Sequence, residues 1–303
     1  MMGLKEILPE VMAEFPEMGR ADIRDLKKGI DGAFKSFVRE YGEAIEGFFY
    51  PLKMFLSWFD NLMLATPWPL LILIFAGLVW LGSRSWVITI GTVLSSFLIG
   101  YLGMWEDMMH TLALISVSTF VCIAVGIPIG ILMAKSDRLQ SIVVPILDFM
   151  QTIPAFVYLI PVLMLLGIGK APGLIAVCIY AMPPVIRLTD LGIRLVDKDV
   201  LEAADAFGAS GRQKMFSVQL PLALPNVFAG VNQTIMMALA MVVVAALIGA
   251  PGLGSQVLKA VNNQYLTLGI MNGSAIVAIA IVFDRVSQRF GKRLQRHTET
   301  VHG

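Results

Sequence analysis

The chain has 303 residues, of which 57% are hydrophobic and only 15% charged, and its formal net charge is +1. A soluble domain of this length cannot bury so much apolar surface, so the composition predicts an all-α polytopic protein of the lipid bilayer. Lys and Arg form no long basic run, which excludes a nucleic-acid-binding role. Cys122 and Cys178 lie inside apolar runs without metal-ligand spacing, so we expect neither a disulfide nor a metal site.

The first part of the chain has the pattern of an amphipathic helix. From Ile30 to Leu62 apolar residues recur every three or four positions, with charged residues between them. Such a helix either packs on its own protein or lies on the membrane surface. Pro51 is expected to kink or divide it. The first long apolar run begins only near Trp68, so no cleaved signal peptide is expected.

Apolar segments long enough, or nearly so, to cross a bilayer fill the rest of the chain. They are seven in number and lie at about 68–82, 86–103, 111–134, 142–167, 172–196, 223–248 and 267–283. The first two are short and close together, so they form either two spans or a tight hairpin that dips into the membrane and returns. The total number of spans is odd in both cases.

Basic residues of the short loops fix the predicted orientation, because cytoplasmic loops are enriched in Lys and Arg. They fall on alternate connections, at Arg84, at Lys135 and Arg138, at Arg187, from Arg194 to Lys214, and from Arg285 to Arg296. The N-terminus is therefore predicted outside and the C-terminus inside, in a bacterial inner membrane.

The spans and loops predict four regions. Residues 1–66 are an extracytoplasmic tail with the amphipathic helix, 67–104 two N-terminal spans, 105–284 a five-span core, and 285–303 a basic cytoplasmic tail. The core contains a cytoplasmic loop at 197–222.

This loop has the punctuation of a helix-turn-helix. Asp199 and Glu202 have the spacing of a capping box, which predicts a short helix from about 200 to 207. Gly208 suits the left-handed position after a helix end. A second helix starts at Ser210, and Pro221 and Pro225 are expected to turn the chain back to the membrane.

The same loop resembles the EAA loop of bacterial ABC-importer permeases. The matching residues are Glu202, Ala203, Ala204, Gly208, Val218, Leu220 and Pro221. The family has Ile where this chain has Val218, which is a conservative difference. The resemblance implies that the loop couples the permease to an ATPase, and the two alanines and the glycine allow the close approach that such contact needs.

Two further stretches, 147–156 and 248–254, resemble the glycine betaine and proline betaine permease branch, and the likeness covers about residues 55–290. It implies a type I ABC-importer permease that works as a homodimer by alternating access. Its partners would be cytoplasmic ATPase subunits and an extracytoplasmic binding protein that delivers a quaternary amine. The sequence has no Gly-x-x-x-x-Gly-Lys-Ser/Thr phosphate loop, so ATP and Mg²⁺ are expected on another chain, with no catalytic residue or cofactor here.

Four residues are candidates for the translocation path. Asp148 is a carboxylate in an apolar run, so it either lines a path or gate or pairs locally near the cytoplasmic end. Gln151 and Thr152 lie beside Pro154, and they either line a broken helix or satisfy the carbonyl that the proline frees.

Four other residues are given less direct roles. Phe149 and Phe156 share a helix face, where packing is favoured over contact with a quaternary ammonium group. Arg187 and Asp190 are expected to pair on one helix surface. His110 is assigned no role.

Three alternatives to an importer of quaternary amines stay open. A permease for another small solute, such as an amino acid or a sulfonate, differs only in substrate. A passive channel has no use for the complete loop pattern. An intramembrane enzyme needs a second catalytic group beside Asp148, and none is evident in the sequence.

Overall fold

The fold is given by a computed structural model that describes residues 17–299, so the ends of the predicted tails, 1–16 and 300–303, lie outside the described residues. Within that range every regular element is a helix, as predicted. The elements are α2 (Arg20–Ala65), α3 (Trp68–Ser83), α4 (Trp86–Tyr101), α5 (Trp105–Lys135), α6 (Asp137–Thr152), η2 (Ala155–Tyr158), α7 (Leu159–Leu166), α8 (Lys170–Ala181), α9 (Pro183–Arg194), α10 (Lys198–Ala206), α11 (Gly211–Gln213), η3 (Lys214–Gln219), α12 (Leu220–Ala245), η4 (Ala246–Ile248), α13 (Leu253–Asn263) and α14 (Leu266–Glu299).

The chain divides into two units, Met1–Phe48 and Phe49–Gly303. The described part of the first unit is mainly the beginning of α2, where apolar side chains such as Ile30 and Phe37 are exposed. In the second unit, the end of α2 buries Leu56, Asp60 and Met63. Pro51 does not divide this helix, which is continuous from Arg20 to Ala65.

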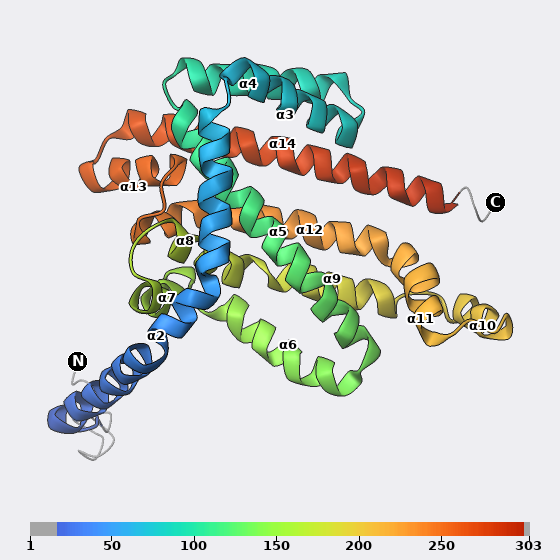
Figure 1. Cartoon of the computed structure of the whole chain (residues 1–303), viewed down its shortest axis with the longest axis horizontal. Helices are drawn as coiled ribbons and strands as arrows, with labels where there is room; N and C mark the ends of the chain where they lie inside the picture. The colour runs from blue at the N-terminus through green and yellow to red at the C-terminus, as the bar shows by residue number, and fades with distance from the viewer. Residues whose placement is uncertain (1–16, 300–303) are drawn as a thin grey trace, which may run out of the picture. The chain divides into compact units, whose positions relative to one another are not determined.

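The helices α3 and α4 form a hairpin that lies beside α14 (Figure 1). Each has 16 residues and is therefore about 24 Å long, less than the roughly 30 Å of a hydrocarbon core. Arg84 makes the turn between them in a left-handed conformation, with φ 48°. The chain turns by 113° between α2 and α3.

Four helical stretches between residues 17 and 299 are long and apolar enough to cross a membrane: Trp105–Lys135, Lys170–Arg194, Gly211–Ile248 and Leu266–Gly291. The predicted span at 142–167 is not one straight helix: α6 and the η2–α7 segment meet at an angle of 105°, so this stretch is either a broken span or a re-entrant loop. Pro154, which has no N–H to continue the ladder of α6, follows the last residue of that helix and its cap Ile153. The helix α14 also extends beyond the predicted span, through most of the predicted basic tail.

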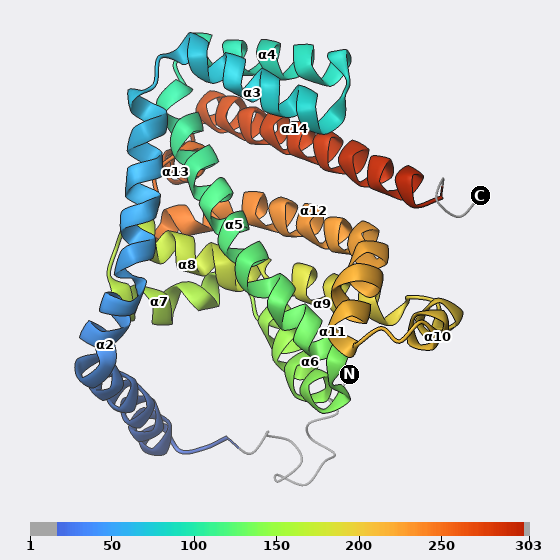
Figure 2. The same ribbon diagram turned by 45° about the vertical axis from the view of Figure 1, so that its right-hand side comes forward.

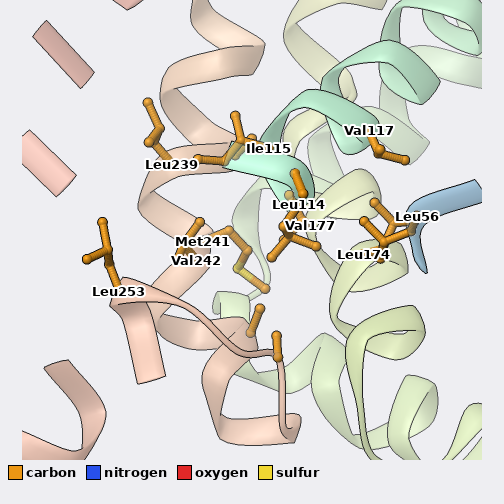
Figure 3. Close-up of a cluster of buried hydrophobic side chains, with 14 of the residues drawn as sticks. Leu56, Leu114, Ile115, Val117, Leu174, Val177, Leu239, Met241, Val242 and Leu253 are labelled. Carbon is orange, nitrogen blue, oxygen red and sulfur yellow. The ribbon is translucent and has the colours of Figure 1, made fainter. Parts of the chain in front are cut away.

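Buried aliphatic side chains of α5, α8 and α12 form the centre of the second unit (Figure 3). Leu114, Val177 and Met241 are each at most 3% exposed and come from these three helices. Leu56 adds the end of α2 to the same cluster. This core fixes the helix ends from which the polar sites project.

The second unit has two distinct ends (Figures 1 and 2). One end carries α10, the α3–α4 turn at Arg84, the α5–α6 connection and the end of α14. The other end carries the beginnings of α5 and α8.

Candidate functional site

The first helix of the predicted loop, α10, starts earlier than its sequence pattern indicates. Its N-cap is Asp197, whose carboxylate accepts a hydrogen bond from the backbone N–H of Asp199 at 3.0 Å. The predicted capping box of Asp199 and Glu202 is therefore wrong. Asp197 is the residue with extended backbone angles, and only such a residue directs its side chain at the free N–H groups of the first turn.

The end of α10 follows the prediction for Gly208, which has φ +75°. The N–H of Gly208 donates to the carbonyl of Asp205 at 2.9 Å, and the N–H of Ala209 donates to the carbonyl of Ala204 at 3.0 Å. These two bonds are those of a Schellman motif. A Cβ at Gly208 would have no heavy atom within 4 Å, so the demand for glycine in the folded loop comes from the backbone angle.

The second helix starts at Ser210, as predicted, with a complete capping box between Ser210 and Gln213. The Lys214 ammonium bridges to both carboxylate oxygens of Asp205 at 2.7 Å and so fastens the two helices together. Pro221 and Pro225 do not end the helix, since helical structure continues from Gly211 to Ile248 through the π-helical segment η3, but the ribbon bends between α11 and α12 (Figure 2). Pro221 fits because it lies in the first turn of α12.

The pattern residues divide into an outer and an inner group. Glu202 and Ala203 are exposed, whereas Val218 and Leu220 are half-buried and hold the loop to its own chain. Sequence reasoning missed Phe207, whose ring is 93% exposed beside Gly208. An apolar residue directly before the glycine of a polar loop was the available signal. The outer face thus presents the exposed ring of Phe207 near the small side chain of Ala203.

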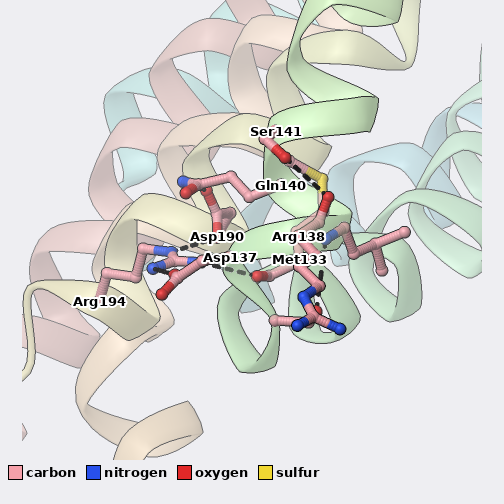
Figure 4. Close-up of polar contacts among 9 residues, drawn as sticks. Met133, Asp137, Arg138, Gln140, Ser141, Asp190 and Arg194 are labelled. Atoms are coloured by element: carbon pink, nitrogen blue, oxygen red, sulfur yellow. Dashed lines mark hydrogen bonds and ion pairs between the residues drawn. The ribbon is translucent and has the colours of Figure 1, made fainter.

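A polar network fixes the helix that leads into this loop (Figure 4). Arg194, the last residue of α9, contacts Asp190 at 2.9 Å, Asp137 of α6 at 2.6 Å and the carbonyl of Met133 at 2.8 Å. Gln140 donates to the other oxygen of Asp190 at 2.7 Å. The predicted pair of Arg187 and Asp190 is wrong, because each of these residues has partners on α6.

The helix α9 is also packed unusually closely between α5 and α12. A Cβ at Gly130 of α5 would lie 2.7 Å from the carbonyl oxygen of Ile186, and one at Gly230 of α12 would lie 3.0 Å from the Cα of Val185. Close backbone contact of this kind is how helices associate in membranes, where apolar side chains gain little by leaving lipid. The backbone of α9 is thus in close contact with both α5 and α12.

The predicted path residues cluster at the break after α6. Asp148 lies eleven residues after Asp137, about 16 Å along the helix, and pairs with Arg187 of α9 at 2.5 Å. Its side chain is 56% exposed and that of Arg187 is 34% exposed. Asp148 thus lies farther from the start of its helix than the predicted segment, which begins at residue 142, implies. Its partner is on another helix.

The residues near Pro154 are joined by local hydrogen bonds. The Thr152 hydroxyl donates to the carbonyl of Phe149 at 3.3 Å. The Tyr158 hydroxyl, which sequence reasoning did not consider in this role, donates to the carbonyl of Met150, the one that Pro154 leaves without a helical donor. Gln151 is half-buried, so this group borders the exposed side of the break.

The exposure of Phe149 and Phe156 bears on the prediction that these two rings pack. Phe149 and Phe156 are 64% and 61% exposed, so the prediction that they pack is wrong for this chain alone. Among residues 17–299, no three His, Cys, Asp or Glu side chains lie together as a metal site requires. The described geometry offers an exposed helix-turn-helix and a charged, exposed helix break.

Apolar helices of membrane-crossing length with a polar helix-turn-helix at one end define a polytopic membrane protein. The chain belongs to the family of binding-protein-dependent transport system inner membrane components, whose pattern matches residues 126–296. It is therefore a multi-pass permease, and permeases of this family work with ATPase and binding-protein subunits. The resemblance seen in the sequence is confirmed.

Individual relatives support this assignment. The chain is 44% identical to the glycine betaine/proline betaine transport system permease protein ProW of Escherichia coli, over 84% of this chain and 72% of that protein. It is 43% identical to the glycine betaine transport system permease protein OpuAB of Bacillus subtilis, over 91% of this chain and 96% of that protein. A structure of the MetNI methionine ABC transporter shares the fold with a TM-score of 0.56 and 22% identity, covering 61% of this chain and 93% of that one.

Proposed function

We propose that this chain is the permease subunit of an ATP-driven importer that carries quaternary amines such as glycine betaine. The observation that carries the proposal is the similarity to the Bacillus subtilis glycine betaine permease, which covers 96% of that protein at 43% identity. The region that aligns with this relative includes both the spans and the loop. A permease for an amino acid has the same fold, as the methionine transporter illustrates, and is the second candidate.

The loop from Glu202 to Gly208 docks on a cytoplasmic ATPase, which holds ATP and Mg²⁺ and performs the hydrolysis. Phe207 enters an apolar recess of that partner, while Ala203 and Ala204 leave room for its backbone. The Lys214–Asp205 pair and the network of Arg194 keep the loop rigid on α9 and η3, which supports this role. Movement of the ATPases is thereby transmitted through α9 to the spans.

We place the loop in the cytoplasm and the N-terminal tail outside. The basic turn at Arg84 and the connection at Lys135 and Arg138 lie at the same end of the second unit as α10, which supports this orientation under the positive-inside rule (Figure 1). The bundle then presents the starts of α5 and α8 to the binding protein.

A second copy of the chain completes the path. An exposed ion pair of Asp148 and Arg187 on a membrane helix is costly against lipid, so it faces either water or another protein surface. Two copies that meet along α6 would cover Phe149 and Phe156 and leave Asp148, Gln151 and Thr152 around a water-filled passage. ATP binding opens this passage outward, and hydrolysis returns it to the cytoplasmic side.

The test is uptake by proteoliposomes that contain this permease, its ATPase and its binding protein. We expect ATP-dependent uptake of radiolabelled glycine betaine that excess proline betaine, choline or carnitine reduces and methionine does not. Uptake of methionine in place of glycine betaine would establish the second candidate. Solute flux without ATP would instead indicate a passive channel.

A further inference from the structure

A buried ion cluster lies at the end of the second unit opposite α10. The carboxylate of Asp60, near the end of α2, is 2% exposed and contacts two basic side chains. His110 Nδ1, in the second turn of α5, lies 2.8 Å from one of its oxygens. The ammonium of Lys170, the first residue of α8, donates to the other oxygen. Asp60 therefore joins three helices through one carboxylate.

The cluster borders the loop between η4 and α13. Ala250 and Pro251 line a small cavity together with Asp60, His110 and Lys170. The loop is held on both sides, because the N–H of Leu253 donates to the Thr111 hydroxyl at 2.9 Å and the N–H of Gly169 donates to the carbonyl of Ile248 at 2.8 Å. The residues that bind Asp60 are thus next to those that hold the loop.

The end of α2 is also attached by apolar residues next to this carboxylate. Leu56 and Met63, one turn away on either side, are at most 6% exposed and already supply apolar contact. A buried ion pair commonly stabilises a fold no better than apolar residues of the same size, but it does restrict the geometry of its partners. What Asp60 adds is a fixed relation between the first turns of α5 and α8.

We propose that Asp60 is a positioning residue for transport: through Lys170 and His110 it holds the ends of α5 and α8, and the loop at 249–252, in the arrangement that responds to the binding protein. The proposal rests on the proposed function, which presents this end to the binding protein. The cluster and the coupling loop are at opposite ends, so loss of Asp60 should leave basal hydrolysis intact and weaken its stimulation.

The first experiment compares Asp60→Asn with wild type in the complete transporter. We expect the ratio of stimulated to basal ATPase activity to fall about fivefold or more, the lower range of coupling between separate sites, with unchanged basal activity. Glu106→Gln is the matched control, since Glu106 is an exposed carboxylate at the same end. It should behave as wild type. An unaltered ratio in Asp60→Asn would overturn the proposal.

A second readout does not depend on a binding protein. Ser255, half-buried at the start of α13, is replaced by cysteine, and its labelling by a water-soluble thiol reagent is timed. Asp60→Asn should accelerate labelling about fivefold because the loop is no longer held. If no binding protein stimulates the ATPase activity of the wild-type transporter, the proposed function is contradicted. The labelling rates still decide the role of Asp60 in that case. Equal labelling rates would refute the positioning role.

The variant Asp60→Asn/Lys170→Met separates positioning from stability. Asp60→Asn alone leaves the partly exposed Lys170 without its counter-ion, and Lys170→Met alone leaves the buried Asp60 with His110 as its remaining partner, whereas the double change removes both charges. We expect the double variant to regain thermal stability and to keep the fast labelling and the weak stimulation. Recovery of all three properties would show that Asp60 serves stability alone and would overturn the proposal.

Discussion

The close contact of α5 with α9 can be tested at Gly130. In Gly130→Ala the new Cβ would lie 2.6 Å from the Cβ of Thr189 and 2.7 Å from the carbonyl oxygen of Ile186. The carbonyl belongs to the backbone and cannot rotate away, so the helices must separate by several tenths of an ångström or more. Overpacking of this kind costs about 1–3 kcal/mol.

Thermal unfolding of the purified permease in detergent measures this cost. A loss of 1 kcal/mol lowers Tm by about 2–4 °C in a protein of roughly this size, so Gly130→Ala should lose about 2–12 °C. Gly91→Ala in α4 is the matched control, because its Cβ would have no heavy atom within 4 Å. Equal Tm values for the two variants would refute the packing argument. A shifted α9 should also lower the uptake obtained per ATP hydrolysed.

Two predictions concern the loop and the topology. Gly208→Asp places a side chain at φ +75°, which costs about 1 kcal/mol, so membrane abundance should be near normal while the ATPase no longer copurifies; normal uptake would exclude Gly208 from the coupling surface. A cysteine at the exposed position Ser36 should react with an impermeant thiol reagent added to intact spheroplasts, and reaction only after lysis would invert the proposed orientation.

Local sequence patterns predicted the helices and most of the helix-turn-helix loop. Gly208 and Ser210 were placed correctly because a left-handed turn and a capping box depend on residues a few positions apart. The N-cap was misplaced by two residues, since Asp197 and Asp199 are chemically alike. Which of them caps α10 depends on the backbone angle at which the chain leaves α9.

Contacts between distant segments could not be predicted in the same way. His110 was given no role, yet it binds Asp60, fifty positions earlier in the sequence. Arg187 was paired with Asp190 by helical spacing, but the packing of α6 against α9 gives Arg187 the carboxylate of Asp148 instead. A single sequence shows which residues are costly to bury, but it does not show which helix supplies their partners.

The pair of Asp148 and Arg187 allows the path itself to be tested. Both side chains are more than a third exposed, and exposed pairs contribute about 0–1 kcal/mol to stability. Asp148→Asn should therefore leave Tm almost unchanged. If the carboxylate lines a water-filled path, its loss should reduce uptake several-fold at unchanged basal ATPase activity, and Asp148→Glu, which keeps the charge, should restore much of it. If the pair only fastens α6 to α9, Asp148→Asn will transport as wild type, and Asp148 must then be removed from the proposed path.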